Sequence, residues 1–183
     1  MLREIHTNRM LLRCPKEGDG VLVYPAVLES LEVLRAWPAS LPWALAEPSV
    51  AASEAFARES AANFTLGSSF VYFCFDHQGD FIACAGLHRH SFNELQFELG
   101  YWCRKGRQAQ GYTKEAAKAL LQYAFGELGA NRVNAKTDEL NSPSRAVCES
   151  SGMKLVRVLQ NESFSPTGEL RNVCLYAATR SEV

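Results

Sequence analysis

The stretch QAQGYTKEA, residues 108–116, carries the strongest fold signal in this chain. It follows an apolar, strand-like run and opens a segment with the periodicity of a long amphipathic helix. The first N–H groups of a helix have no intrahelical partner, and the helix dipole makes that end positive. Gly111 lets the backbone adopt a left-handed conformation and approach an anion closely. The stretch therefore predicts a phosphate-binding turn, with an ordinary strand-to-helix turn as the alternative.

Two other phosphate-binding motifs do not fit this stretch. Gly106 and Gly111 have the spacing of a P-loop, but Tyr112 and Thr113 stand where its lysine and its Ser or Thr should be. A Rossmann fingerprint is excluded as well, because the required Gly-x-Gly is absent. The turn therefore has to be of another kind.

The elements expected around the turn include both strands and helices. Hydrophobic periodicity predicts strands over 10–14, 70–75, 81–87, 93–103, 132–137, 154–162 and 172–179, and helices over 18–36, 49–63, 111–128 and 141–152. Ser49 or Ser53 is expected to cap the second helix, and Pro25 to split the first helix or start its second half. This order, without linker or repeat, predicts an α/β chain of α+β type. It would form one domain over residues 1–183, with a mixed β-sheet and helices on both faces.

Composition and charge narrow the function classes. The chain has 183 residues, 47% of them hydrophobic and 21% charged, which is ordinary for a soluble globular protein. Its formal net charge of -1 gives no electrostatic reason to expect a nucleic-acid partner. No apolar run approaches the ~20 residues that span a bilayer, and the first residues contain no signal-peptide core. We expect a cytoplasmic protein without a membrane partner.

The cysteines indicate a reducing compartment. They are scattered, form no Cys-x-x-Cys pair and mostly lie in apolar runs: Cys14, Cys74, Cys84, Cys103, Cys148 and Cys174. Such spacing favours buried free thiols over disulfides, and it provides no pair of zinc ligands. No metal site is expected.

Several motifs in order resemble the GNAT acetyltransferases, specifically their RimJ/RimL-type branch. The pyrophosphate turn of that family, Gln/Arg-x-x-Gly-x-Gly/Ala, corresponds to Gln108-x-x-Gly111-x-Thr113. The other matching stretches are TNRMLLR at 7–13, the Trp-Pro-rich stretch at 37–43, ELGYW at 98–102, NSPS at 141–144 and SGM at 151–153. The resemblance implies the GNAT acyl-CoA N-acyltransferase fold. In that fold two strands, here 95–103 and 132–137, splay apart and admit the pantetheine arm of acetyl-CoA.

The resemblance also implies which residues bind acetyl-CoA. Backbone N–H groups of the turn would bind its pyrophosphate, and the strand end and the NSPS helix start would lie beside the thioester. The expected cofactor-binding residues are Trp102, Cys103, Arg104, Gln108, Ala109, Gln110, Gly111, Tyr112, Thr113, Asn141 and Ser144. Asn141 and Ser144 also fit a helix cap. Basic residues at 104, 105 and 107 either screen phosphate or form a solvated cluster.

Two positions of the turn depart from the family pattern. Ala109 replaces a glycine, and Thr113 replaces a glycine or alanine. If position 109 requires a positive φ, alanine adds strain of ~1 kcal/mol or more. These departures support a rival interpretation, in which the chain is a non-catalytic acyl-CoA-binding or regulatory protein.

The catalytic residues implied by the resemblance are Glu98 and Ser144. Glu98 would accept the amine proton through a water, and Glu94 is a weaker candidate for this base. The alternative is that Glu98 is an exposed strand residue or pairs with an arginine. Ser144 would hydrogen-bond the departing sulfur, and backbone N–H groups of residues 102–104 would polarise the carbonyl. Cys103 is not expected to form an acyl intermediate, because the family reaction is direct attack by the amine.

For several other polar and aromatic residues, a role in catalysis or acceptor binding has to be set beside a purely structural one. Tyr112 and Tyr176 could protonate a thiolate but are better explained as packing residues. His88 and His90 lie at the end of a strand that the implied fold places near the substrate side, and exposed loop residues are the favoured interpretation. Trp37 and Trp43 either line an acceptor groove or pack in the core.

The resemblance implies an acceptor amine as the second substrate. The first choice is the α-amine of a protein or peptide N-terminus. The second is a small-molecule amine such as a polyamine, an amino acid or a drug. A homodimer is also expected, since this branch is often dimeric.

Overall fold

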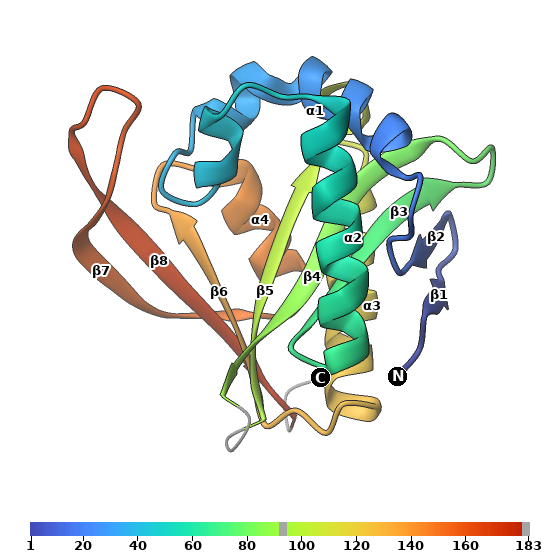
Figure 1. The fold of residues 1–183 in the computed structure, drawn as a ribbon. Coiled ribbons are helices and arrows are strands. Elements are labelled where there is room, and N and C mark those ends of the chain that lie inside the picture. The colour runs from blue at the N-terminus through green and yellow to red at the C-terminus, as the bar shows by residue number, and fades with distance from the viewer. Residues whose placement is uncertain (92–94, 181–183) are drawn as a thin grey trace.

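The computed structural model describes residues 1–91 and 95–180, which form one eight-stranded sheet in the order β1-β2-β3-β4-β5-β6-β8-β7 (Figure 1). The strands are β1 Glu4–His6, β2 Met10–Arg13, β3 Ser69–Asp76, β4 Phe81–Ser91, β5 Gln96–Cys103, β6 Arg132–Asp138, β7 Lys154–Phe164 and β8 Leu170–Thr179. Only β5 and β6 pair in parallel, and the other neighbours are antiparallel. The predicted mixed sheet is therefore confirmed.

Helices cover both faces of the sheet. They are α1 Gly20–Arg35, α2 Val50–Leu66, α3 Tyr112–Gly126 and α4 Ser142–Ser150, with the short 3-10 helices η1 Pro42–Leu45 and η2 Lys105–Arg107. In Figure 1, α2 crosses in front of the sheet and α3 lies behind it. Two apolar clusters result, one beneath α1 and η1 around Phe73 and Trp102, and a larger one beneath α3 around Leu120 and Phe97.

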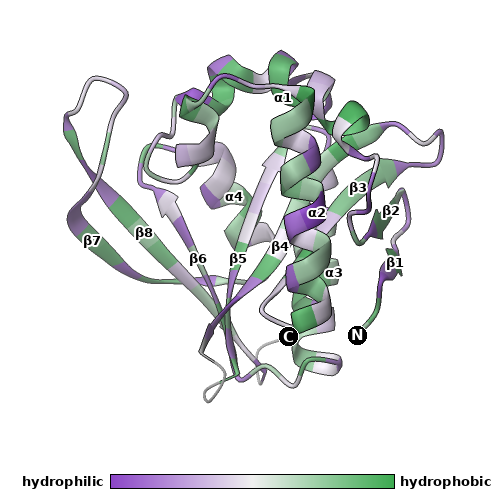
Figure 2. Cartoon of the chain, in the orientation of Figure 1, coloured by the Kyte–Doolittle hydropathy of each residue, from purple (hydrophilic) through white to green (hydrophobic). Residues whose placement is uncertain are grey.

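Local sequence explains most element ends. The Ser49 hydroxyl accepts a hydrogen bond from Ala52 N at 3.0 Å, so Ser49 rather than Ser53 caps α2. Gly67 ends that helix in a left-handed conformation with φ 72°. All the interior residues of β3 are buried, and Figure 2 colours this strand largely hydrophobic. A strand buried on both faces reads as a continuous apolar run, which is the pattern at 70–75.

Some expectations differ from the structure. Pro25 does not split the first helix: α1 is continuous from Gly20 to Arg35. Because proline has no N–H, Pro25 leaves the Val21 carbonyl without its helical hydrogen bond. Both residues lie on the exposed face of α1, where water can bind that carbonyl instead. The strand β1 and both 3-10 helices are additional elements. The predicted strand start at 93 and the candidate base Glu94 lie outside the described residues.

The parallel pair β5–β6 is short. Its register runs from Gln96 opposite Arg132 to Glu98 opposite Asn134 and ends there, although both strands continue. Beyond Glu98 the two strands diverge, as the resemblance implied. The sheet therefore has an opening in its middle rather than at an edge.

No helix in residues 1–91 and 95–180 has the length and apolar character needed to cross a membrane.

Candidate active site

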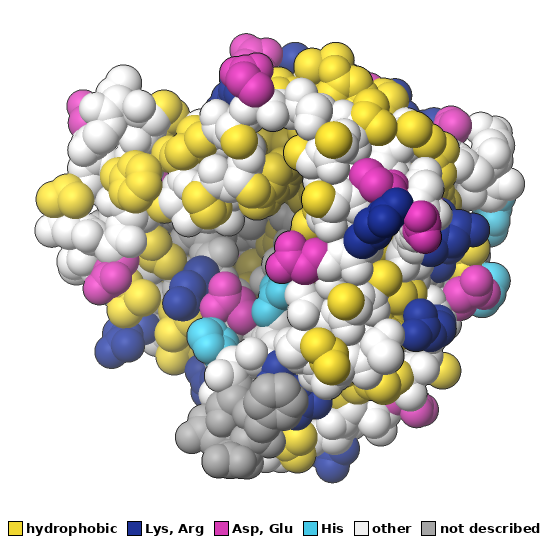
Figure 3. Space-filling view, in the orientation of Figure 1, with side chains coloured by type: hydrophobic (Ala, Val, Ile, Leu, Met, Phe, Trp, Pro, Cys, Tyr) yellow, Lys and Arg dark blue, Asp and Glu magenta, His cyan; other side chains and the backbone are white. Residues whose placement is uncertain are grey.

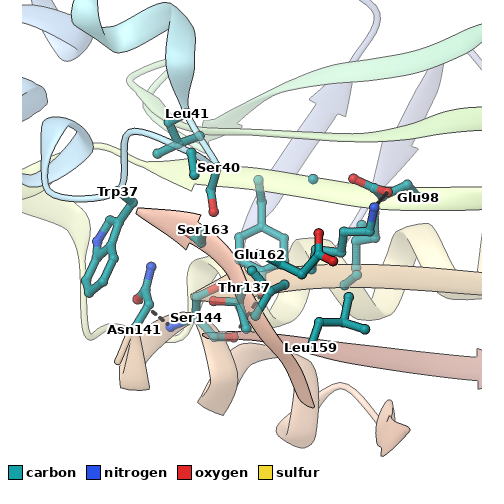
Figure 4. A pocket seen from close by; sticks show the side chains of 17 residues that line it. Trp37, Ser40, Leu41, Glu98, Thr137, Asn141, Ser144, Leu159, Glu162 and Ser163 are labelled. Carbon is teal, nitrogen blue, oxygen red and sulfur yellow. Dashed lines mark hydrogen bonds and ion pairs between the residues drawn. The ribbon is translucent and has the colours of Figure 1, made fainter. Parts of the chain in front are cut away.

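A cavity of about 400 Å³ occupies the opening between β5 and β6. The walls come from Glu98 to Tyr101 of β5, residues 135–137 of β6, the start of α4, and Glu162 and Ser163 of β7. Trp37 and Leu41 close it from the segment between α1 and η1. Figure 4 shows Glu98 at one end of this cavity and Trp37 and Asn141 at the other. The predicted catalytic residues Glu98 and Ser144 thus line the same cavity.

The Glu98 carboxylate has cationic or potentially cationic neighbours. Its Oε2 lies 3.0 Å from His90 Nε2 and 3.8 Å from Lys136 Nζ, and about one third of the side chain is exposed. His88 is its direct cross-strand neighbour on β4. Glu162 is a second carboxylate on the cavity wall, from a strand in which no catalytic residue was predicted. Glu98 and Glu162 are therefore both candidates for a proton acceptor in this cavity. Of the two, Glu98 lies where β5 and β6 separate.

Hydroxyl groups gather on the α4 side of the cavity. Asn141 Oδ1 accepts a hydrogen bond from Ser144 N at 3.1 Å, so Asn141 caps α4. The Tyr101 hydroxyl donates to Ser144 O at 2.9 Å and lies 3.1 Å from Ser144 Oγ. It is also 3.2 Å from Cys148 Sγ, and burial raises the pKa of Tyr101 above its usual value. Tyr101 was not predicted as a site residue, because alternation along a strand does not show which side chains reach a cavity.

Tyr112 and Tyr176, the two tyrosines considered as proton donors to a thiolate, make packing contacts. Tyr176 is fully buried and donates a hydrogen bond to Glu149 Oε1 at 2.7 Å. Tyr112 begins α3 and lies beneath the guanidinium of Arg9, whose carbon is 4.4 Å from the ring centroid. Neither lines the cavity between β5 and β6.

The predicted phosphate-binding turn connects η2 to α3. Gly111 is the N-cap of α3 with φ 82°, and no side chain caps the helix. The first intrahelical bond runs from Glu115 N to Gly111 O, so the N–H groups of Tyr112, Thr113 and Lys114 precede it. Residues 109–111 are exposed, so these groups face an accessible surface. The local geometry therefore fits an anionic group such as a pyrophosphate.

Ala109 has a strained backbone. Its φ is 58°, in the left-handed region that disfavours residues with a Cβ atom. This is the condition under which the sequence predicted strain. Thr113 has a contact of its own, because its side chain hydrogen-bonds Cys103 and so ties the helix start to the end of β5.

Arg9 supports the turn from a distant part of the sequence. Its Nη1 donates to Gln110 O at 2.9 Å, and its Nε is 2.7 Å from Glu115 Oε2. Its backbone N–H donates to the other oxygen of Glu115 at 2.9 Å. The resemblance included Arg9 only within an opening strand, and no sequence spacing relates it to residue 110. It is a positioning residue that was missed.

The basic residues near the turn are paired with acids. Arg104 Nε lies 2.6 Å from Glu29 Oε2, and this hydrogen bond holds the pKa of Glu29 below its ordinary value. Lys105 pairs with Glu32 at 3.1 Å, and Arg107 pairs with Asp80 at 2.8 Å. The basic residues at 104, 105 and 107 therefore form ion pairs with α1 and the β3–β4 turn.

Helix α1 also binds the backbone of this segment. Glu29 Oε1 accepts from Gly106 N at 2.8 Å, and Ser30 Oγ accepts from Lys105 N at 2.9 Å. Gln108 Nε2 and Gln110 Nε2 donate to carbonyls within the segment, at Cys103 O and Gly106 O. Both glutamines therefore shape the turn from inside.

The backbone N–H groups that point toward β6 differ from the predicted set, which was that of residues 102–104. Arg104 N donates to Ile82 O on β4 at 2.9 Å, so its N–H does not face the opening. Because N–H groups alternate along a strand, those of Leu99, Tyr101 and Cys103 point toward β6. Of residues 102–104, only Cys103 can therefore supply an oxyanion donor there. Its thiol is part-buried, and burial raises its pKa.

The Trp102 side chain points away from the turn, into a second cavity. This cavity has about 450 Å³ and lies between the sheet and helices α1 and α2. Trp43 also lines it, with ring centroids 5.8 Å from Trp102. Trp37 and Trp43 thus both line cavities, as their acceptor-groove interpretation required. We call this second cavity the apolar chamber, and Figure 3 shows its hydrophobic lining in the central hollow.

His88 and His90 are exposed, as expected, but they lie in strand β4 rather than in a loop, and His88 lines the apolar chamber. Its Nδ1 is 2.9 Å from Ser69 Oγ. Desolvation lowers its pKa from the ordinary value, although the charge of Glu98 opposes this.

Sequence and structure comparisons agree on the family. Residues 9–154 match the acetyltransferase (GNAT) domain family. The FsC-acetyl coenzyme A-N(2)-transacetylase of Aspergillus fumigatus is 35% identical over 97 residues, 50% of this chain and 40% of that protein. YdaF, a putative ribosomal N-acetyltransferase of Bacillus subtilis, is 35% identical over 71 residues, 38% of this chain and 39% of that protein. The chain thus matches about two fifths of the length of these relatives.

A solved structure extends the likeness over the whole fold. The RimL ribosomal L7/L12 alpha-N-protein acetyltransferase in complex with coenzyme A superposes with a TM-score of 0.87 at 19% identity, covering 98% of this chain and 99% of that one. At this identity the likeness establishes the fold. Since the family match spans most of the chain, and the splayed strands and the glycine turn are present, this protein belongs to the GNAT acetyltransferase family.

Proposed function

We propose that this protein is an acetyl-CoA-dependent N-acetyltransferase whose acceptor is the α-amine of a protein or peptide N-terminus. The observation that carries the proposal is the divergence of β5 and β6 after Glu98. It gathers a carboxylate, strand N–H donors and the Ser144 hydroxyl around one cavity. The likeness to RimL and to YdaF supports the N-terminal acceptor.

The residues that would hold acetyl-CoA are those of the turn. Its pyrophosphate would bind the N–H groups of Tyr112, Thr113 and Lys114, with Gly111 allowing close approach. When bound, acetyl-CoA supplies an activated thioester carbonyl for the amine to attack. The N–H of Cys103 and those of Leu99 and Tyr101 are the backbone donors available to polarise that carbonyl.

The acceptor must lose a proton, because an ammonium has no lone pair. An N-terminal α-amine has a pKa near 8, so about a tenth is neutral at pH 7. Glu98, acting through a water, would remove the proton from the remainder. On the opposite side, Ser144 would donate a hydrogen bond to the departing sulfur, and Tyr101 would position Ser144 through the bond that it donates to Ser144 O.

Small-molecule amines are a second class of acceptor. A cavity of 450 Å³ falls in the ~300–1,000 Å³ range of ligand pockets. The strained Ala109 supports the different, regulatory interpretation, in which acetyl-CoA binds and nothing is transferred.

The test measures release of free CoA from acetyl-CoA with N-terminal peptides, polyamines and amino acids as acceptors, and identifies products by mass. Acetylation of a peptide α-amine supports the proposal. Acetylation of small amines alone would favour the second class. Stabilisation of the protein by acetyl-CoA without CoA release under any condition would identify a binding protein.

A further inference from the structure

The floor of the apolar chamber consists of three cross-strand pairs between β4 and β5. In order along the strands these are Cys84 with Trp102, Gly86 with Gly100, and His88 with Glu98. All six residues line the chamber. The paired glycines leave a gap in the side-chain layer between a bulky aromatic end and a polar end.

The two floor glycines keep this gap open for different reasons. A Cβ at Gly86 would come within 3.1 Å of Val71 Cα, so the neighbouring strand excludes a side chain there. A Cβ at Gly100 would lie 3.5 Å from His88 Nε2, an ordinary contact that would cover the imidazole. The absence of a side chain at Gly100 therefore leaves the His88 ring accessible from the chamber.

The walls and roof of the chamber are apolar. Helix α1 contributes Val23, Val27 and Leu31, while Trp43 and Phe56 come from η1 and α2. Trp43 and Phe56 keep 45% and 40% of their surface exposed, which is high for side chains that line a cavity. Exposed aromatic surface facing a cavity indicates that an apolar group can be bound there.

The charges around the chamber suit a cation. The described residues that line it include Glu47 and Glu98 but no lysine or arginine, and the basic partners of these carboxylates, Arg35 at 3.3 Å and Lys136 at 3.8 Å, are not among its lining residues. The chamber also shares five lining residues with the cavity between β5 and β6: Ser40, Leu41, Glu98, Gly100 and Tyr101. A group at the His88–Glu98 end of the chamber is therefore next to the place where transfer would occur.

We infer that the apolar chamber selects the acceptor, binding a peptide whose N-terminal residue has a bulky apolar side chain such as Phe or Leu. The inference rests on the proposed function and specifies its substrate. The side chain lies over the Gly86–Gly100 pair against Trp43 and Trp102, and the α-amine lies between His88 and Glu98. A small first residue leaves the aromatic surface uncovered and loses the hydrophobic contribution.

The experiment compares initial rates for peptides identical except at the first residue, which is Phe, Leu, Ser or Ala. We expect kcat/KM to be at least about tenfold higher for Phe and Leu than for Ser and Ala. Equal rates, or a preference for Ser and Ala, would overturn the inference and leave the proposed acetyltransferase intact. If none of the peptides is acetylated, both fail together.

A filling variant tests the chamber itself. Ala52 lines the chamber from an exposed position on α2, so Ala52→Phe fills space without disturbing the core. Ala55→Phe is the matched control, since Ala55 is exposed on the same helix and does not line the chamber. Ala52→Phe should reduce kcat/KM for the Phe peptide at least about tenfold and leave the Ala peptide within about twofold. Equal effects on both peptides, or a similar loss in the control, would contradict the assignment.

Phenethylamine distinguishes the source of the apolar group. It carries the phenyl ring and a primary amine but no peptide. A kcat/KM below that of the Phe peptide supports an N-terminal residue as the acceptor. A value more than about tenfold above it would overturn the peptide assignment in favour of an arylalkylamine.

Discussion

The Tyr101 hydroxyl lies 3.1 Å from Ser144 Oγ, so a strand of the sheet and the first turn of α4 share one hydrogen-bonded pair of hydroxyls. Tyr101 also donates to the Ser144 carbonyl, which fixes its orientation. If Ser144 acts on the departing sulfur, it acts as a unit with Tyr101.

Tyr101→Phe should therefore lower kcat about 10²–10³-fold, as the loss of one preorganised donor does. Ser144→Ala should have a similar effect. The double variant should be little worse than either, because contacting residues give non-additive effects. Strict additivity of the two losses, measured under saturating acetyl-CoA, would mean that the hydroxyls act separately.

Substitution by the isosteric glutamine shows whether Glu98 or Glu162 is the proton acceptor. Glu98→Gln should lower kcat/KM with an N-terminal peptide about 10²–10⁴-fold at pH 7. The deficit should shrink toward pH 9, since an amine of pKa near 8 is then mostly neutral without help. Glu169→Gln, at an exposed position outside the cavity, controls for the loss of a charge. A larger loss of kcat/KM in Glu162→Gln than in Glu98→Gln would mean that Glu162 on β7 is the base.

Ala109→Gly should stabilise the protein, which is unusual for a substitution to glycine. A left-handed alanine costs ~1–2 kcal/mol, and the greater freedom of glycine in the unfolded chain offsets about 0.4–1 kcal/mol of the relief. A net gain of about 0.5–1 kcal/mol would raise Tm by about 1–4 °C. The control Ala55→Gly lies within α2 and should lose about 1 kcal/mol. If Ala109→Gly lowers Tm in thermal unfolding without acetyl-CoA, the turn is not strained.

His88 should make the protein less stable in mild acid. Its folded pKa is lowered by desolvation, below the ~6.5 of an unfolded histidine. As pH falls through 6.5 toward the folded pKa, the unfolded chain binds the proton first, so the free energy of unfolding decreases. His88→Asn removes this contribution. Denaturant unfolding between pH 7.5 and 5.5 should show a smaller decrease for the variant, and parallel curves would contradict the lowered pKa of His88.

The sequence predicted the order of elements because each element has a local signal. The apolar run of β3, the periodicity of α3 and the glycine at its N-cap are contained in a few consecutive residues. The strain at Ala109 was also predictable, since it follows from one replaced glycine. The place of Glu98 and Ser144 on one cavity depended on the resemblance, and the structure has this arrangement.

The chamber could not be predicted, because it depends on register. The pairing of Gly86 with Gly100 brings together two residues that are unremarkable separately. A shift of one residue would turn His88 to the other face of the sheet. Arg9 was missed for a similar reason: its contact with Gln110 joins segments that are a hundred residues apart.

Helix α1 is common to both proposed substrate sites. One side of it, with Val27 and Leu31, lines the chamber, while Glu29 and Ser30 hold the backbone of Lys105 and Gly106 just before the turn. An acceptor that displaces α1 therefore also moves the segment that precedes the acetyl-CoA turn. Thermodynamic linkage then makes the effect reciprocal: whatever factor the acceptor applies to acetyl-CoA affinity, acetyl-CoA applies to acceptor affinity. The fold thus provides a mechanical route for cooperative formation of the ternary complex.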